Sequence, residues 1–298
     1  MLLVTGGSGF IGSHLTENLA ASDDVTIVDK NPPKHRGNEK IKYVRHDLCN
    51  KSDAVFRGAE TVYHFAAYPD VKASGSNPYA SFRNNVTATF NVLEGCRVND
   101  VKKIIFASTS AVYGNATLPT REDHPIAPVS IYGATKAACE SMIKAYHETY
   151  GIGATIMRYA NVVGPRSTHG VIYDFVNKLL QNSITMEILG NGKQKKSYMH
   201  VNDCITATLV AGKTTGFSIF NAGSSDSIEV NKIASIVAAE MGAKNVIFNH
   251  RGGTTGWKGD VPVMMLETKK LRRLLWKPAY SSEDSVRDCT RWLVEGKK

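Results

Sequence analysis

The sequence lacks the features that mark metalloproteins, disulfide-rich secreted domains and membrane proteins. Its five cysteines are scattered, odd in number and without metal-ligand spacing, and its nine histidines contain no His-x-x-x-His pair. No apolar run reaches the roughly 20 residues that a membrane-spanning helix needs. The chain starts directly with a strand-like run and not with a cleavable leader. We therefore expect a cytoplasmic protein with reduced thiols, no metal site and no membrane partner.

Internal repeats, low-complexity linkers and long charged blocks are missing as well. A chain of 298 residues with 42% hydrophobic content can bury a large core, in one large or two intimately joined domains. The net charge of +9 favours anionic partners such as nucleic acid, membrane headgroups or phosphorylated metabolites. However, the group Lys269, Lys270, Arg272 and Arg273 is best interpreted as the solvated face of a helix expected at about 266–275. The charge is therefore a bias, and no nucleic-acid partner is expected.

A glycine-rich loop lies near the start of the chain, between two predicted strands. A strand at residues 2–5 runs into the loop, and a helix at 14–21 and a strand at 25–28 follow. A helix N-terminus after a tight glycine turn attracts phosphate, so this order is typical of dinucleotide binding. The three loop glycines are assigned to the tight turn, to close approach of a pyrophosphate and to close helix packing, in the order Gly6, Gly9 and Gly12.

An acidic residue follows the second strand. Asp29 lies where an acceptor for a ribose 2′-hydroxyl is required, and its carboxylate would repel a 2′-phosphate, which favours NAD over NADP. The alternation of strands and helices continues and predicts a parallel α/β sheet of the Rossmann type, doubly wound with helices on both faces. Polar side chains gather where these strands end, which is where such sheets bind ligands. The further predicted strands are 42–46, 61–65, 104–107 and 154–159.

A long amphipathic helix is predicted from Tyr132 to about Gly151, with Ser130 as its N-cap. Tyr132 and Lys136 then share one face, one turn apart. A phenol with a pKa of about 10 is a poor base at neutral pH, and the Lys136 charge could lower it, as could a cationic nicotinamide. The spacing alone is weak evidence, since Tyr68 repeats it with a lysine four residues later in a predicted turn.

The spacing Gly-x-x-Gly-x-x-Gly and the Tyr-x-x-x-Lys helix together resemble the extended branch of the short-chain dehydrogenase/reductase superfamily, which acts on nucleotide sugars. The resemblance covers nearly the whole chain and is strongest before residue 166. It implies a catalytic set of Tyr132, Lys136 and Thr109, with Ser108 and Ser110 as rivals to Thr109. It implies that NAD contacts Gly6, Gly9, Phe10, Ile11, Gly12, Asp29, Lys30, Asn31, Asp47, Leu48, Phe65, Ala66, Ala67, Asn85, Ser108, Tyr132, Lys136 and Tyr159.

The same resemblance implies that a UDP-sugar substrate contacts Thr109, Asn161, Val171, Lys196 and Asp260. Lys196 and Trp257 stand where family members commonly carry arginine, so the diphosphate must be held differently, because a lysine lacks the bidentate fork. No carboxylate follows Thr109, which argues against the dehydratases and decarboxylases of the branch. The chain most resembles the short prokaryotic or archaeal UDP-glucose 4-epimerases.

Three alternatives stay open. One is another epimerase, for UDP-glucuronate or UDP-N-acetylhexosamine; the second is a net NAD-dependent oxidoreductase on a nucleotide sugar. The third is a catalytically silent NAD-binding or RNA-associated protein, against which the set of Thr109, Tyr132 and Lys136 counts. We expect an NAD-binding domain at residues 1–165 and a smaller, interleaved substrate-binding region at 166–298, with a segment near 201–225 returning to the first sheet. The resemblance also implies a homodimer that pairs through the helices near 82–97 and 132–150.

Overall fold

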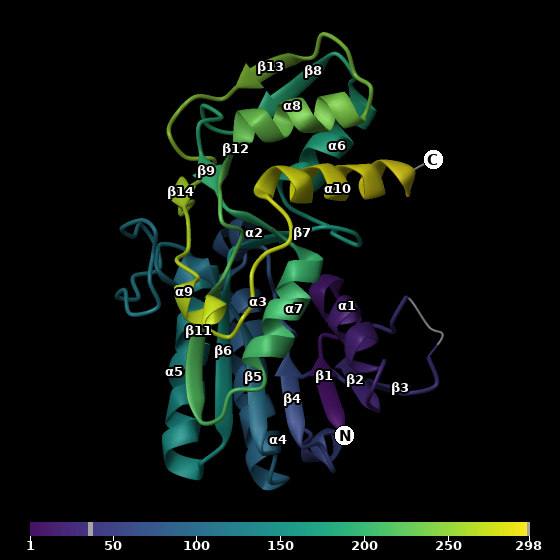
Figure 1. Ribbon diagram of the computed structural model, residues 1–298, viewed down its shortest axis with the longest axis vertical. Coiled ribbons are helices and arrows are strands. Elements are labelled where there is room, and N and C mark those ends of the chain that lie inside the picture. The colour runs from purple at the N-terminus through teal and green to yellow at the C-terminus, as the bar shows by residue number, and fades with distance from the viewer. Residues whose placement is uncertain (35–37, 297–298) are drawn as a thin grey trace. The chain divides into compact units, whose positions relative to one another are not determined.

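The computed structural model describes residues 1–34 and 38–296 (Figure 1). The chain folds into two compact units. Unit 1 consists of Met1–Gly114, Ile126–Arg158 and Ile205–Phe220, and unit 2 takes Asn115–Pro125, Tyr159–Cys204 and the chain from Asn221 onward. The return to unit 1 lies within the segment near 201–225, whereas the excursion at Asn115–Pro125 has no counterpart in the expected division.

A seven-stranded sheet forms the centre of unit 1. Its order is β11-β6-β5-β4-β1-β2-β3, and the pairs β3–β2, β2–β1, β1–β4 and β4–β5 are parallel. The order runs outward from β1 in both directions, so β1 and β4 flank the point at which doubly wound sheets bind ligands. The predicted α/β fold class is confirmed. The strands are β1 (Leu2–Thr5), β2 (Val25–Asp29), β3 (Ile41–Arg45), β4 (Thr61–His64), β5 (Lys103–Thr109), β6 (Gly153–Tyr159) and β11 (Phe217–Ala222).

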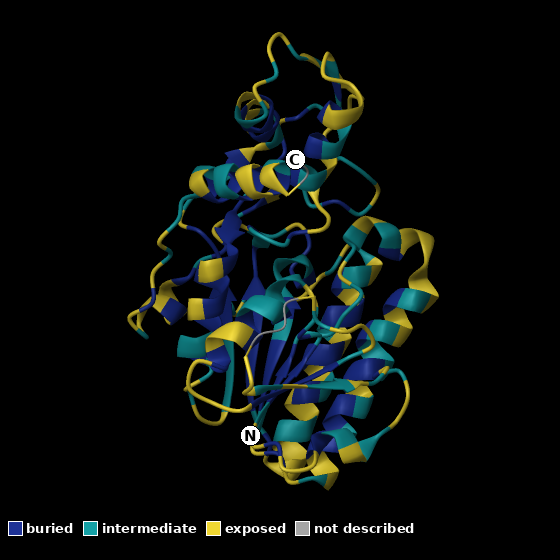
Figure 2. Cartoon of the chain, turned by 90° about the vertical axis from the view of Figure 1, so that its right-hand side faces the viewer, coloured by how far each residue is buried: buried dark blue, intermediate teal, exposed yellow. Residues whose placement is uncertain are grey.

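Helices connect these strands and bury their apolar faces on the sheet. Leu3, Val62, Ile104 and Ile156, each from a different strand, are all but inaccessible to solvent. In Figure 2 the strands in the middle of the sheet are mostly dark blue, while the outer faces of the helices are largely yellow and teal. The helices are α1 (Phe10–Leu19), η1 (Asp53–Phe56), α2 (Val71–Ser76), α3 (Pro78–Phe82), the π-helix η2 (Arg83–Thr87), α4 (Ala88–Val98), η3 (Ser110–Val112), α5 (Ile131–Tyr150) and α7 (Val201–Ala211), which starts in unit 2.

Unit 2 contains three small sheets and a helical layer with its own core. The sheets pair β10 with β7, β9 with β12 and β14, and β13 with β8. Phe175 of α6, Ile233 of α8 and Val286 of α10 belong to one buried cluster. The elements are β7 (Asn161–Val163), α6 (Val171–Gln181), β8 (Thr185–Ile188), β9 (Lys195–Lys196), β10 (Tyr198–His200), β12 (Ile228–Glu229), α8 (Val230–Glu240), β13 (Ile247–His250), β14 (Val263–Met264), α9 (Lys269–Arg272) and α10 (Ser282–Glu295).

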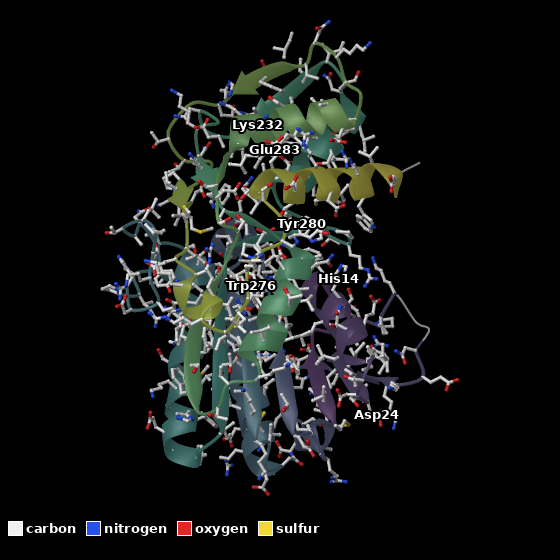
Figure 3. All side chains as sticks on the ribbon, in the orientation of Figure 1. His14, Asp24, Lys232, Trp276, Tyr280 and Glu283 are labelled. Atoms are coloured by element: carbon white, nitrogen blue, oxygen red, sulfur yellow. The ribbon has the colours of Figure 1, made fainter. Side chains whose placement is uncertain are left out.

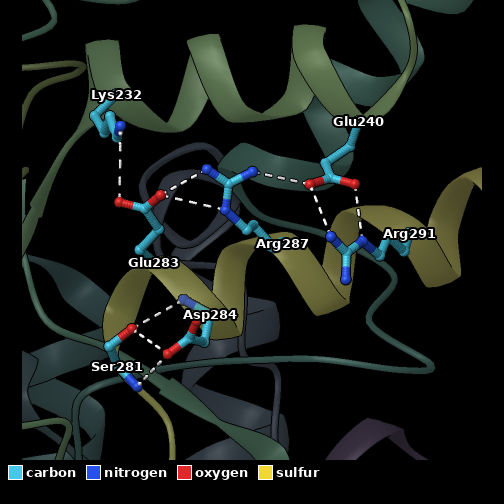
Figure 4. A network of polar contacts seen from close by, with 7 residues as sticks. All are labelled: Lys232, Glu240, Ser281, Glu283, Asp284, Arg287 and Arg291. Atoms are coloured by element: carbon cyan, nitrogen blue, oxygen red, sulfur yellow. Dashed lines mark hydrogen bonds and ion pairs between the residues drawn. The ribbon is translucent and has the colours of Figure 1, made fainter.

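Ion pairs join α8 to α10 on the outside of this core (Figure 4). Glu240 accepts hydrogen bonds from Arg287 at 2.9 Å and from Arg291 at 2.8 Å. Arg287 also pairs with Glu283, one turn away on α10. The capping box that starts α10 lies directly below this network, with Ser281 as the N-cap. The network therefore fixes how the two helices pack, although its exposed members contribute little individually.

The aromatic side chains labelled in Figure 3 include two anchors of the segment between α9 and α10. Trp276 is 4% exposed, and Tyr280 stacks on the buried His200 with ring centroids 4.0 Å apart. The backbone N–H groups of Ala279 and Tyr280 donate to the Asp203 carboxylate. In the described part of the chain, no helix is long and apolar enough to cross a membrane.

Two predicted helices differ from the structure. The helix expected at 266–275 is reduced to α9, because Leu266 forms an isolated β-bridge with Thr120 and the neighbouring backbone bonds to it. Leu275 ends this segment with a φ of 63°, which lies outside the range of a right-handed α-helix. The helix expected at 82–97 contains the π-turn η2 at its start, which side-chain periodicity does not reveal.

Candidate active site

The N-terminus of α5 is held by two serine side chains, one from the adjoining sequence and one from α2. Ser130 is the N-cap, and its hydroxyl accepts from the N–H of Gly133 at 3.1 Å. The buried hydroxyl of Ser74 on α2 accepts from the N–H of Tyr132 at 3.2 Å, so a second unpaired donor of the first turn is satisfied. Gly151 ends the helix in the left-handed region, with a φ of 72°. Tyr132 therefore has a fixed position in the first turn.

Thr109, the last residue of β5, faces Tyr132. Burial raises the pKa of Tyr132 to about 12, and a hydrogen bond with the Thr109 side chain opposes the increase. The Thr109 hydroxyl also accepts from the N–H of Ala111 at 3.1 Å, which fixes its rotamer at the start of η3. Ser108 points elsewhere, because its buried hydroxyl donates to Glu140. Of the three hydroxyls in this segment, Thr109 is thus the one that the structure brings to Tyr132.

Lys136 lies one turn after Tyr132 and is only 2% exposed. Its ammonium donates to the carbonyl of Ala107 at 2.8 Å and lies 4.5 Å from the ring centroid of Phe106. Burial lowers the pKa of Lys136 to about 8, while the nearby Cys139 and Glu140 act in the opposite direction. An ammonium on this face, with two further hydrogens to donate, is suited to hold a hydroxyl-bearing ligand beside Tyr132.

The glycine loop packs so closely that side chains would not fit. A Cβ on Gly6, whose φ is 72°, would lie 2.5 Å from the amide nitrogen of Ala66. A Cβ on Gly12 would lie 2.1 Å from the carbonyl oxygen of Gly6. Gly9 precedes α1 as its N-cap and leaves the backbone accessible. Phe10 and Ile11 form the first turn of α1, and both are partly exposed.

Asp29 ends β2 directly beside this loop. Its carboxylate accepts from the N–H of Ser8 at 3.2 Å and from the N–H of Asn31 at 3.0 Å. The Ser8 hydroxyl in turn donates to the carbonyl of Asn31, so the loop and the end of β2 are tied together. Lys30 and Asn31 are exposed at this edge. A ribose beside the loop would therefore meet a carboxylate that is already oriented.

The next strand ends carry the other residues assigned to the cofactor. Asp47 follows β3, and hydrogen bonding from Cys49 lowers the pKa of its carboxyl. Leu48 is buried beside it, and its carbonyl accepts from Asn91. After β4 come three partly exposed residues, Phe65, Ala66 and Ala67.

Asn85 lies in the π-helix and joins three segments. Its carbonyl oxygen accepts from the N–H of Tyr68 at 2.7 Å, and its amide donates to the hydroxyl of Thr135 at 2.9 Å. Thr135 donates in turn to the carbonyl of Tyr132. The side chain is 1% exposed, so in this structure Asn85 links the strand-end segment to α5. Because π-turns widen a helix locally, this geometry places the amide where a regular turn would not.

The substrate residues expected in the second half of the chain lie in unit 2. Lys196 and Asp260 form a buried ion pair at 2.5 Å, and the Lys196 ammonium lies 5.3 Å from the Trp257 ring. The amide nitrogen of Asn161 and the indole nitrogen of Trp257 are buried, and neither has a hydrogen-bond partner within the described residues. Val171 starts α6, partly exposed. Unpaired buried donors are costly, so both nitrogens are candidates for ligand contacts.

Tyr159, assigned to the cofactor, is buried and begins the second segment of unit 2. Within 1–34 and 38–296, no group of three His, Cys, Asp or Glu side chains is arranged to hold a metal ion.

Sequence reasoning missed four buried polar residues around α5: Ser74, Tyr113, Glu140 and Arg158. Glu140 and Arg158 form an ion pair at 2.6 Å with almost no exposure. One signal was present, since Glu140 follows Lys136 by four residues and so continues the face of Tyr132 and Lys136. Its partner on β6 could not be identified without the fold.

Comparison with known proteins gives matches over the whole chain. Residues 2–223 match the profile described as the NAD dependent epimerase/dehydratase family. A protein of Methanocaldococcus jannaschii, provisionally named a UDP-glucose 4-epimerase, is 36% identical in an alignment of 305 positions that covers 98% of each protein. A UDP-glucuronate 4-epimerase of Thermodesulfobacterium geofontis is 30% identical over 321 residues, covering 98% of this chain and 96% of its own. A crystal structure of a UDP-galactose 4-epimerase is 40% identical with a TM-score of 0.90, and 99% of both chains is covered.

Proposed function

Because the chain belongs to the NAD dependent epimerase/dehydratase family, we propose that it is a UDP-glucose 4-epimerase, which interconverts UDP-galactose and UDP-glucose. The predicted family and the predicted NAD cofactor are confirmed, and the chain is an enzyme of the nucleotide-sugar epimerase type. The observation that carries the finer proposal is the contact between Tyr132 and Thr109, with Lys136 one turn away and no carboxylate in the segment after Thr109.

The glycine loop of unit 1 fits the dinucleotide. Gly6 and Gly12 lie where a Cβ would collide with backbone atoms, so only glycine lets the turn and α1 pack this closely. The N-terminus of α1 then offers its free N–H groups to a pyrophosphate. Asp29 offers its carboxylate to the ribose, as NAD requires. When bound, NAD supplies an acceptor for the hydride from C4 of the sugar and a positive charge beside Tyr132.

In the proposed reaction, the phenolate oxygen of Tyr132 removes the proton from the 4-hydroxyl of the hexose. The Thr109 hydroxyl donates to the same oxygen atom and keeps it in line with Tyr132. Lys136 holds the nicotinamide ribose through its ammonium and favours the ionised phenol. After the 4-keto sugar turns, C4 would take the hydride back on its opposite face, and the same oxygen atom would take the proton back from Tyr132. The cycle has no net change in protons or oxidation state, so it needs no external reductant.

The nucleotide of the substrate is assigned to unit 2. Asn161 and Trp257 each carry a buried nitrogen that no described residue bonds, and Lys196 supplies a cation for the diphosphate. Asp260 neutralises part of the Lys196 charge, so this site would bind a diphosphate with a single point charge and the neighbouring amide. Such a grip on the nucleotide leaves the hexose free to turn.

A UDP-glucuronate 4-epimerase is the second candidate, because a protein of that name is 30% identical over almost the whole chain. Both candidates use the same base and cofactor. They differ in the group at C5 of the sugar, a hydroxymethyl or a carboxylate, which the residues named above do not distinguish.

We also propose that the protein is a homodimer, formed through α4 and α5. Phe90 and Val98 on α4 and Tyr150 on α5 are 46%, 48% and 52% exposed. Large apolar side chains concentrated on two neighbouring helices favour an interface between copies. Light scattering on the purified protein, with Phe90→Lys as the disrupting variant, tests the proposal; a monomeric wild-type protein contradicts it.

The function is tested with a panel of UDP-sugars. Purified protein is incubated with UDP-galactose, UDP-glucose, UDP-glucuronate and UDP-N-acetylglucosamine, without added NAD or reductant, and the products are separated by chromatography. We expect UDP-galactose and UDP-glucose to approach one equilibrium ratio from both sides. Inversion of UDP-glucuronate alone would assign the second candidate, and a requirement for stoichiometric NAD would indicate a net oxidoreductase. Either result contradicts the proposal.

A further inference from the structure

We propose that Ser108, Glu140 and Arg158 form a buried positioning network, which sets the register of α5 against the end of β5 and thereby holds Tyr132, Lys136 and Thr109 in their working arrangement. The proposal rests on the function proposed above for these three residues. All members of the network belong to unit 1 and none is more than 4% exposed, so none of them is available to solvent.

The network is built from charge-assisted hydrogen bonds. The Arg158 guanidinium donates to both carboxylate oxygens of Glu140, from Nε at 3.0 and 3.2 Å and from Nη2 at 2.6 Å. Its Nη1 donates to the Tyr113 hydroxyl at 2.8 Å. The Ser108 hydroxyl donates to Oε1 of Glu140. Glu140 on α5 is thus bonded to both β5 and β6.

The contacts between α5 and β5 form a regular pattern. Tyr132, Lys136 and Glu140 follow each other at intervals of four residues and therefore lie along one face of α5. Three consecutive positions at the end of β5 meet this face: the Ala107 carbonyl accepts from Lys136, the Ser108 hydroxyl donates to Glu140, and the Thr109 side chain bonds to Tyr132. Any slip or tilt of α5 would disturb all three contacts together.

The cost of the network suggests that it has a role beyond stability. Removing two opposite charges from water is expensive, and a buried ion pair can often be replaced by apolar side chains with no loss of stability. What apolar side chains cannot supply is direction, because carboxylate and guanidinium groups bond only in defined geometries. A chain that needed only a packed core here would have no use for Glu140 and Arg158.

The network also sets the charge around Lys136. The Glu140 carboxylate lies one turn from the ammonium, where it opposes the lowering of the Lys136 pKa by burial. Loss of this negative charge would make Lys136 lose its proton at lower pH. Arg158 holds the Glu140 carboxylate in place through three hydrogen bonds, so the position of this charge relative to Lys136 depends on both residues.

The test replaces the two charges together, as Glu140→Leu with Arg158→Met, so that neither is left buried and unpaired. We expect this double variant to fold, to retain NAD and to keep its KM for the UDP-sugar, while kcat falls about 10- to 100-fold, the cost of a misplaced reacting group. The alkaline limb of its kcat profile should move to lower pH. Unchanged kcat and an unchanged pH profile in the folded double variant would overturn the proposal.

A milder pair of variants decides the matter if the double variant does not fold. Ser108→Ala removes one hydroxyl from the network, and Ser141→Ala removes an exposed hydroxyl that bonds only to its own helix, α5. We expect kcat to fall in Ser108→Ala and to stay at the wild-type value in Ser141→Ala, with KM unchanged in both. Equal kcat values in the two variants would overturn the proposal.

Failure of the proposed function can be told apart from failure of the network. If the wild-type protein inverts no UDP-sugar, the function is wrong, and the network is then tested in crystals of Ser108→Ala with NAD. The distance from Lys136 Nζ to the Ala107 carbonyl, now 2.8 Å, should lengthen when Ser108 no longer holds Glu140. An unaltered distance would refute the positioning role without reference to activity.

Discussion

Asn85 is the side chain whose replacement most sharply tests how the site is held together. The variant Asn85→Asp has the same shape but no donor. Thr135 uses its hydroxyl hydrogen to bond the Tyr132 carbonyl, so it must accept from the Asn85 amide at 2.9 Å. An aspartate would place a carboxylate oxygen next to the Thr135 hydroxyl oxygen. When ionised, it would also place a negative charge at a position that is 1% exposed.

The expected loss follows from these contacts. One buried acceptor left without its donor and one buried carboxylate without a cation should together lower the free energy of unfolding by about 2–5 kcal/mol. The matched control is Asn84→Asp, because Asn84 is the partly exposed neighbour, and its amide donates only to the Ala80 carbonyl in its own turn. Urea unfolding at pH 7 measures both variants. If Asn85→Asp unfolds within about 0.5 kcal/mol of Asn84→Asp, the polarity assigned to these bonds is wrong.

Three further changes have clear expectations. Gly12→Ala should abolish NAD binding in titration calorimetry, since its Cβ would lie 2.1 Å from the Gly6 carbonyl; Gly75→Ala, a helical position with open space, should bind normally and gain about 0.4–1 kcal/mol of stability. Hydrogen bonds from Arg97 and from Tyr146 hold the pKa of Glu94 at about 2, below its ordinary 4.5. Glu94 thus stabilises the fold above about pH 4.5 and loses this effect as the pH falls toward 2. Glu94→Gln should therefore be less stable than wild type at pH 6, and the difference should shrink steadily as the pH falls from 4.5 to 2; a constant difference refutes this.

Much of unit 1 could be predicted from the sequence, because its signals are local. Within seven positions, the loop from Gly6 to Gly12 contains the glycines for the tight turn, for the approach of a ligand to the backbone and for the packing of α1. The two ends of α5 are marked by Ser130 and Gly151. Each of these features depends on residues that are neighbours in the chain. Periodicity and capping therefore predicted the succession of strands and helices along the chain, and the ends of the predicted strands indicated where the candidate site lies.

The parts that escaped prediction depend on contacts between distant residues. Arg158 follows Glu140 by 18 positions, and no local pattern in either segment indicates that the two side chains form an ion pair. Leu266 was expected at the start of a helix, but the backbone groups on either side of it bond to Thr120. The choice among the hydroxyls around Thr109 was likewise open in the sequence. Ser108 and Thr109 both contact α5, and only the position of the helix along β5 decides which of them meets Tyr132 and which meets Glu140.

The central claim is that Tyr132 is the base, and one measurement addresses it directly. Tyr132→Phe is compared with Tyr79→Phe, which removes a hydroxyl from a 71% exposed side chain on α3, in the conversion of UDP-galactose to UDP-glucose. NAD content is measured in both proteins by release on denaturation. The account predicts that Tyr132→Phe keeps its NAD and loses about 10²–10⁴-fold in kcat, while Tyr79→Phe behaves as wild type. Conversion by Tyr132→Phe at the wild-type rate would contradict it.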